Sequence, residues 1–201
     1  MSRHPTNDQR PHQRLDPATR RALLVEAAAG VFRGRDPNEV GFEEVADAAG
    51  VSRSLVYAYF GDRGGLIAAV YRYTAEQLDA DLQRSSGNAL PDEARLRRVI
   101  RRYLTFARDD PEAWALIASA GAVQHPEVQA ARQERVRRIA QGWPDEPSAR
   151  LIAQAVLGML EAGAQDWVEH RDIGVERATD TLLAVAWAGL AGLRDRGILV
   201  G

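Results

Sequence analysis

Three side chains at the start of a short predicted helix, Arg53, Ser54 and Leu55, could read the edges of nucleic-acid bases. An arginine can form bidentate hydrogen bonds with guanine, a serine can bond to several bases, and a leucine can contact the methyl group of thymine. These contacts require the first turn of the helix to enter a groove of double-stranded DNA. The elements around this helix must therefore hold it at the protein surface.

The segment that contains this helix has the pattern of a helix-turn-helix, over about residues 41–60. Ala46 is small enough for the two helices to cross closely. Gly50 tolerates the positive φ that the turn requires, and Val51 can pin the turn to the core. Ser52 is a favoured N-cap for the second helix. The sequence therefore predicts two short helices joined at residues 49–52, with the start of the second one exposed.

The remainder of the chain is predicted to be helical. Asp16 can cap a first helix in which Pro17 takes the first position. A long helix with an apolar period near that of an α-helix follows over 62–84, and two more long helices, 148–170 and 175–196, close the chain. No segment has the alternation of a strand. The predicted fold class is all-α, with about nine helices.

Composition excludes several classes of protein. The chain has 201 residues, no cysteine and a net charge of −2. A disulfide scaffold, a thiolate zinc site and a cysteine nucleophile are therefore excluded. The longest run without a charged residue, 113–126, is shorter than the roughly 18 residues that a membrane span needs. Residues 1–14 lack the apolar segment of a secretory signal, so we expect a cytoplasmic protein with no membrane partner.

No set of residues predicts catalysis, a metal site or a cofactor. The four histidines are scattered, without partners at ligand spacing. Ser119 and His125 lack the glycine-flanked turn of a hydrolase nucleophile. The arginine-rich segments 95–102 and 132–138 are expected to form solvated helix faces, although a second nucleic-acid patch is the alternative for each.

Taken together, these patterns resemble the TetR (tetracycline-repressor-like) family of transcriptional regulators. That family carries a stretch similar to Ile-Ala-x-x-Ala-Gly-Val-Ser-x-x-x-x-Tyr-x-Tyr-Phe, followed by a short break, a lysine and a leucine. Here the stretch is VADAAGVS at 45–52 and YAYF at 57–60, followed by Arg63 and Leu66. The resemblance covers about Pro17 to Gln77.

The resemblance implies which residues contact DNA. Tyr57, Tyr59 and Arg63 would bind phosphates, which fixes the position of the protein without reading the sequence. Ser52 precedes helix amide groups that can also attract a phosphate. The side chains that face the bases would be those of Arg53, Ser54 and Leu55.

The sequence departs from the family pattern in three places. Gly41 replaces the usual threonine before the first helix of the motif, so a capping hydroxyl is missing. Ser54 and Leu55 replace the usual Gly-Thr, which changes what the second helix presents to DNA. Gly64 and Gly65 follow Arg63, which itself replaces the usual lysine. Because a glycine inside a helix costs roughly 1 kcal/mol relative to alanine, the start of the long helix is expected to be looser than usual.

The resemblance also implies a division into a disordered arm at 1–15, a DNA-binding domain at 16–77, and a ligand-binding and dimerisation domain at 78–201. A small apolar or aromatic effector would bind between helices of the last domain. The candidate pocket residues are Tyr103, Phe106, Trp114, Ile117, Met159, Gln165 and Trp167.

The two closing helices are rich in small residues, and the resemblance implies that they form a four-helix interface in a homodimer. Close pairing within one chain would explain the small residues equally well. The candidate interface residues are Gly158, Ala162, Ala184, Ala188 and Gly192.

These expectations favour a homodimeric repressor that a small-molecule effector releases from a near-palindromic operator in double-stranded DNA. An activator, or a regulator that needs no ligand, would have the same motif. A helical enzyme or carrier that does not bind DNA is a further alternative, which no catalytic residue set supports.

Overall fold

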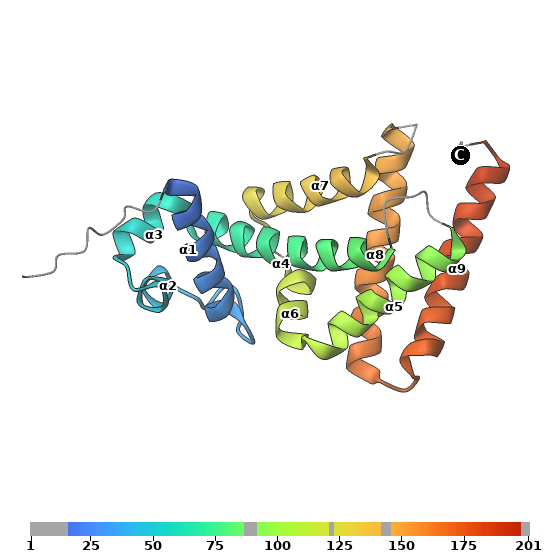
Figure 1. The fold of residues 1–201 in the computed structure, drawn as a ribbon, viewed down its shortest axis with the longest axis horizontal. Coiled ribbons are helices and arrows are strands. Elements are labelled where there is room, and N and C mark those ends of the chain that lie inside the picture. The colour runs from blue at the N-terminus through green and yellow to red at the C-terminus, as the bar shows by residue number, and fades with distance from the viewer. Residues whose placement is uncertain (1–15, 87–91, 121–122, 142–145, 198–201) are drawn as a thin grey trace, which may run out of the picture.

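In the computed structural model, the described residues are 16–86, 92–120, 123–141 and 146–197. These ranges contain nine α-helices and no strand, so the all-α prediction is confirmed (Figure 1). The helices are α1 (Pro17–Phe32), α2 (Phe42–Ala49), α3 (Arg53–Phe60), α4 (Arg63–Ser86), α5 (Glu93–Asp109), α6 (Pro111–Ser119), α7 (Pro126–Ala140), α8 (Glu146–His170) and α9 (Val175–Asp195). The predicted arm at 1–15 lies outside the described residues.

Helices α1 to α3 form a head at one end of the molecule, and α9 lies at the other end (Figure 1). Asp16 begins α1 as predicted, since its carboxylate accepts hydrogen bonds from the amides of Ala18 and Thr19, both at 3.0 Å. The head closes around apolar side chains that are almost completely buried, among them Phe32, Val45 and Val56. Its core is local in sequence, which explains why the pattern of residues predicted its elements well.

Helix α4 runs without a break from the head into the rest of the molecule. The predicted domain boundary between residues 77 and 78 therefore falls inside a helix. Buried residues of α4 belong to one hydrophobic core that also includes residues of α1 and α5. The head and the C-terminal helices thus share both a helix and a core.

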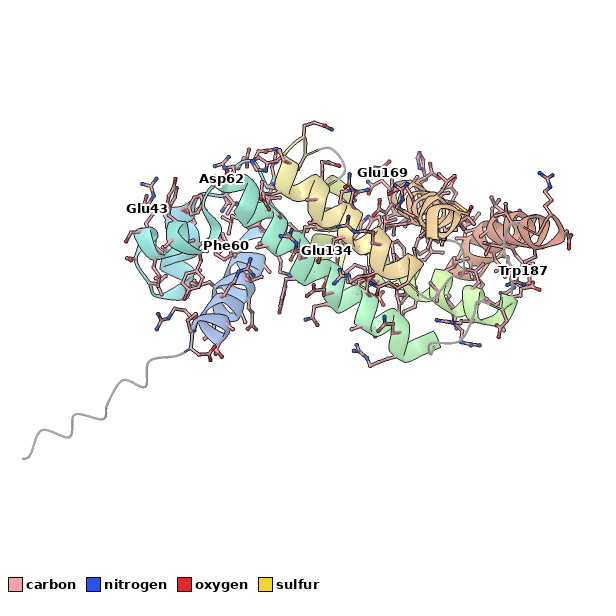
Figure 2. All side chains as sticks on the ribbon, turned by 90° about the horizontal axis from the view of Figure 1, so that it is seen from above. Glu43, Phe60, Asp62, Glu134, Glu169 and Trp187 are labelled. Carbon is pink, nitrogen blue, oxygen red and sulfur yellow. The ribbon has the colours of Figure 1, made fainter. Side chains whose placement is uncertain are left out.

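Helices α5, α6 and α7 pack along α4. Helix α7 lies alongside α4 in both views (Figures 1 and 2), and three ion pairs join the two helices: Arg72–Glu134, Arg138–Glu76 and Arg135–Asp79. Helix α5 crosses α4 and packs along α9. None of the described helices is long and apolar enough to cross a membrane.

The beginning of α4 is a point of very close packing. A Cβ atom added to Gly64 would lie 2.0 Å from the His125 ring at the start of α7, and one added to Gly65 would lie 2.1 Å from the carbonyl oxygen of Phe60. The Asp62 carboxylate accepts a hydrogen bond from the Gly65 amide at 2.8 Å and so caps the helix. Glycine at these two positions therefore allows a close approach that a larger side chain would obstruct.

This contact generates a prediction about stability. Replacing Gly65 with alanine should lower the free energy of unfolding by about 1–3 kcal/mol, the usual cost of overpacking, because the obstructing atom belongs to the backbone and cannot rotate away. Gly30 in α1 is the matched control, since a Cβ there meets nothing within 4 Å. Gly30→Ala should raise stability by roughly 0.5–1 kcal/mol. Denaturant unfolding of both variants measures the difference, and equal effects would contradict the steric explanation.

Candidate nucleic-acid interface

The helix-turn-helix forms as the sequence predicts. Gly50 adopts a left-handed conformation with φ of 64°, and its amide contacts the carbonyls of the last turn of α2. The Val51 amide then donates to the Ala46 carbonyl at 3.0 Å. Ala46 is buried where α2 meets the core, and Val51 packs against that core. The turn is therefore closed by backbone hydrogen bonds and fixed by apolar contact.

As predicted, no side-chain hydroxyl caps the start of α2, because Gly41 occupies the N-cap position. The Gly41 amide donates instead to Glu44 Oε1 at 3.1 Å, which is the other half of a capping box. Glu44 also accepts a hydrogen bond from Arg35. The Arg35 contact, and then the Gly41 amide, hold the pKa of the Glu44 carboxyl below its ordinary value. Glu44 thus replaces the cap and ties α2 to the loop that precedes it.

Helix α3 presents its first turn to solvent. The Ser52 hydroxyl accepts a hydrogen bond from the Leu55 amide at 3.3 Å and lies 3.0 Å from the hydroxyl oxygen of Ser54. Arg53 and Ser54 are exposed as predicted, and no described residue pairs with the Arg53 guanidinium. Leu55, which was also expected to be exposed, is half-buried and is less accessible than Arg53 and Ser54.

The two tyrosines of the motif occupy different environments. Tyr57 is 62% exposed, and its ring lies 5.8 Å from that of Phe42, which supports it from one side. Tyr59 is half-buried and packs against the core. Tyr57 is thus the more accessible candidate for a phosphate contact, and Tyr59 also has a packing role.

Arg63 begins α4 next to the same surface. Its side chain is exposed, and Nη1 donates to the backbone carbonyl of Asn38 in the loop between α1 and α2. The other N–H groups of this guanidinium are left for a ligand. Arg53, Tyr57 and Arg63 together offer charge and hydrogen-bond donors from α3 and from the start of α4, which is the chemistry that DNA phosphates and base edges require.

Two contacts fasten the head to the C-terminal helices. Arg33, after α1, pairs with Asp110 at 2.6 Å and with Glu112 at 3.0 Å, at the junction of α5 and α6. His125 lies against Gly64 with its Nε2 atom 3.7 Å from the Asp62 carboxylate. Figure 2 shows Asp62 at the start of α4, beside the first turn of α7. A displacement of α6 or α7 would therefore act directly on the head.

The candidate pocket residues come together only in part. Tyr103 and Trp114 are buried, with their rings edge to face at 5.5 Å, and Trp114 Nε1 donates to the side-chain oxygen of Gln165 at 3.1 Å. Trp167 instead donates to the carbonyl of Ile173 at 2.8 Å, in the connection between α8 and α9. The other candidates are Ile117, which is completely buried, and Phe106 and Met159, which are half-buried against the same core.

The expectation of a solvated arginine face on α7 is wrong at Arg135, and Arg132 is only half-buried rather than exposed. Arg135 is only 1% exposed, and it pairs with Asp79 of α4 at 2.8 Å. A signal was present in the sequence, because Arg135 lies on the same helix face as the apolar residues Val128 and Ala131. Arg97 and Arg101 of α5, by contrast, are exposed and form ion pairs with α9.

Three of the five candidate interface residues on the closing helices are exposed. These three are Ala162, Ala184 and Ala188. Gly158 and Gly192 are half-buried, yet a Cβ added at either would meet nothing within 4 Å. Within the described residues, close pairing of α8 with α9 therefore does not account for these five residues. Gly163 is different, because a Cβ there would lie 2.8 Å from Leu182 of α9.

Comparison with known proteins agrees with this geometry. Residues 24–70, which include α2, α3 and the start of α4, match the family described as bacterial regulatory proteins, tetR family. The chain is 26% identical over 199 residues to the HTH-type transcriptional activator FasR of Mycolicibacterium smegmatis, which covers 94% of this chain and 91% of that protein. It is 36% identical over 86 residues to the HTH-type transcriptional repressor LfrR of the same species, which covers 43% and 44% of the two chains.

Solved structures extend the likeness to the C-terminal helices. A TetR-like transcriptional regulator from Rhodococcus has 29% identity and a TM-score of 0.60, over 89% of this chain and all (100%) of that one. A tetR-family transcriptional regulator from Streptomyces coelicolor has 25% identity and a TM-score of 0.64, over 88% and 82% of the two chains. With its helix-turn-helix and the exposed first turn of α3, the chain carries the DNA-binding domain of the tetR family at residues 24–70 and is a DNA-binding transcriptional regulator.

Proposed function

We propose that this regulator is a homodimeric repressor, which a small apolar or aromatic effector releases from a near-palindromic operator. In this proposal the head, about residues 16–77, binds DNA. The helices that follow, from about residue 78, hold the effector and form the dimer. The observation that carries the proposal is the outward face of small residues on α8 and α9.

That face has the character of a protein interface. Besides its alanines and glycines it includes Leu151 of α8 and Val185 of α9, which are 70% and 61% exposed. Contiguous exposed apolar surface typically marks an association site, and a closed two-fold dimer is the commonest assembly. Small residues would let the helices of two copies approach closely. A two-fold protein would match a two-fold DNA site, hence the near-palindromic operator.

The buried rings of Tyr103 and Trp114, with the half-buried Gln165 that Trp114 contacts, support an effector site between α5, α6 and α8. Small-molecule sites are largely apolar, with a few polar groups that fix orientation. An effector changes DNA binding only if it binds more tightly to one arrangement of the two heads than to the other. The contacts at Arg33 and His125 are the points through which such a preference would reach the head.

An activator is the second candidate. FasR, which matches over most of the chain, is named an activator, whereas LfrR, which matches over less than half of the chain, is named a repressor. Activation and repression would use the same DNA-binding head. Only the position of the operator and the transcriptional response distinguish an activator from a repressor.

Mapping of DNA binding across the genome, with and without candidate effectors, tests the direction of control. For a repressor, we expect sites that overlap promoters, loss of occupancy with the effector, and higher transcription when the gene is deleted. Lower transcription after deletion would favour the activator instead.

Arg53 and Arg63 form a matched pair that tests the roles of the DNA contacts. Arg53→Ala should relax base preference at one position of each half-site, at a cost of about 1–3 kcal/mol. Arg63→Ala should weaken binding to all sequences alike and should reduce the salt slope by about one unit per half-site. Binding titrations on operator variants at several salt concentrations measure both effects. A uniform loss for Arg53→Ala would make Arg53 a phosphate contact.

Ala188→Arg tests the dimer face. The substitution would bury a charge without a partner at the centre of the proposed interface, so the chain should sediment as a monomer and bind its operator weakly. Ala115→Arg is the control, because Ala115 is exposed on α6, outside the proposed face. If Ala188→Arg remains dimeric and binds DNA normally, the interface lies elsewhere.

A further inference from the structure

A buried polar cluster lies where α4, α5, α7 and α8 meet. The Arg135 cluster, as we call it, consists of Tyr71, Asp79, Tyr103, Arg132, Arg135 and Glu161. Arg135 is at its centre, with Nε 3.2 Å from each Asp79 carboxylate oxygen and Nη1 3.7 Å from Glu161 Oε1. Burial opposes the charge on this guanidinium, but Asp79 outweighs it and raises the pKa of Arg135 above its ordinary value. Arg135 therefore remains charged inside the protein.

Five buried atoms of this cluster make no hydrogen bond of normal length to any described residue. They are the hydroxyl oxygens of Tyr71 and Tyr103, the Nη1 atoms of Arg132 and Arg135, and Glu161 Oε1. The great majority of buried polar atoms in proteins are hydrogen-bonded, so such a concentration requires an explanation. Burial raises the pKa of both tyrosines, against the influence of Arg135. Both hydroxyls therefore stay protonated and can donate.

The charges of the cluster already balance. Arg135 pairs with Asp79, and Arg132 pairs with Glu161 at 2.9 Å. A carboxylate or an ammonium group added here would bring an uncompensated charge into a buried site, which is strongly unfavourable. A neutral group avoids that cost. Because the free atoms are mostly donors, the group that fits them best is an oxygen that accepts hydrogen bonds.

Apolar side chains lie next to this polar centre at Tyr103. The ring of Tyr103 contacts Trp114 edge to face, and Ile100 and Leu104, on the same helix as Tyr103, are completely buried. A molecule that reaches the free donors must therefore have an aromatic or aliphatic body. We propose that the Arg135 cluster binds the neutral carbonyl or hydroxyl head of a small apolar molecule. This inference rests on the proposed effector function and names the chemical class of the effector.

The test uses four probes that share a phenyl ring and an alkyl chain and differ in the terminal polar group. They are phenylbutanol, phenylbutanamide, phenylbutyrate and phenylbutylamine. Binding to the full chain is measured by the shift in Tm and by tryptophan fluorescence. The alcohol and the amide should bind at least about tenfold more tightly than the two ions. Tighter binding of either ion, or no binding of any probe, would overturn the proposal.

Tyr71→Phe and Tyr103→Phe separate a ligand site from a structural network. Since neither hydroxyl makes a hydrogen bond of normal length to a described residue, each variant should keep or raise its Tm and lose about three- to tenfold in affinity for the alcohol and the amide. Tyr73→Phe, on α4 and half-buried, is the matched control and should change neither. A lower Tm with unchanged affinity would make the cluster purely structural and overturn the proposal.

DNA binding is measured separately, so that the two proposals can fail independently. If the neutral probes bind as expected but leave operator affinity unchanged, the Arg135 cluster is a ligand site and effector-controlled release is contradicted. If a probe releases the wild-type protein from DNA, and both tyrosine variants bind that probe with normal affinity, the effector function stands. The assignment of the effector to the Arg135 cluster is then wrong.

Discussion

The close approach of backbone and ring at Gly64 and Gly65 is the constraint on which the arrangement of the molecule depends. At this point the end of α3, the start of α4 and the start of α7 all come within contact distance. A side chain at Gly65 would push α4 away from the backbone of Phe60, and a side chain at Gly64 would displace the His125 ring. The helix that presents Arg53 is therefore positioned against α4, and α7 is seated on the same turn. The first turn of α4 therefore positions both the DNA-binding surface and the C-terminal helices.

The C-terminal helices combine two kinds of surface with opposite character. Around Arg135 they enclose charge and hydroxyl groups, whereas on α8 and α9 they expose alanine, glycine and leucine. Placing polar groups inside and apolar groups outside costs stability in an isolated chain. The cost is explained if an effector binds the enclosed polar groups and a second copy of the chain covers the exposed apolar residues. The proposed effector site and the proposed dimer share this explanation.

How far the sequence predicted the structure depended on the range of the interactions. Asp16, Gly50 and Ser52 act on residues no more than a few positions away. The helix caps and the turn could therefore be predicted from the sequence alone. The burial of Arg135 depends on Asp79 and Glu161, which lie on other helices, and single-sequence patterns do not reveal such partners. The same holds for Gly64, whose neighbour His125 is far along the chain. The half-buried position of Leu55 was missed because a short helix has few residues from which to define its inner face.

The length of α4 has a mechanical consequence. Its 24 residues make a rod of about 36 Å at the usual rise per residue. A tilt of only about 5° at the C-terminal end would move the far end by about 3 Å, close to the separation of successive base pairs along DNA. In a two-fold assembly the two heads would move in opposite senses, and the error in their spacing would double. A rearrangement too small to disturb the core could therefore move α3 of both copies away from the bases of their half-sites.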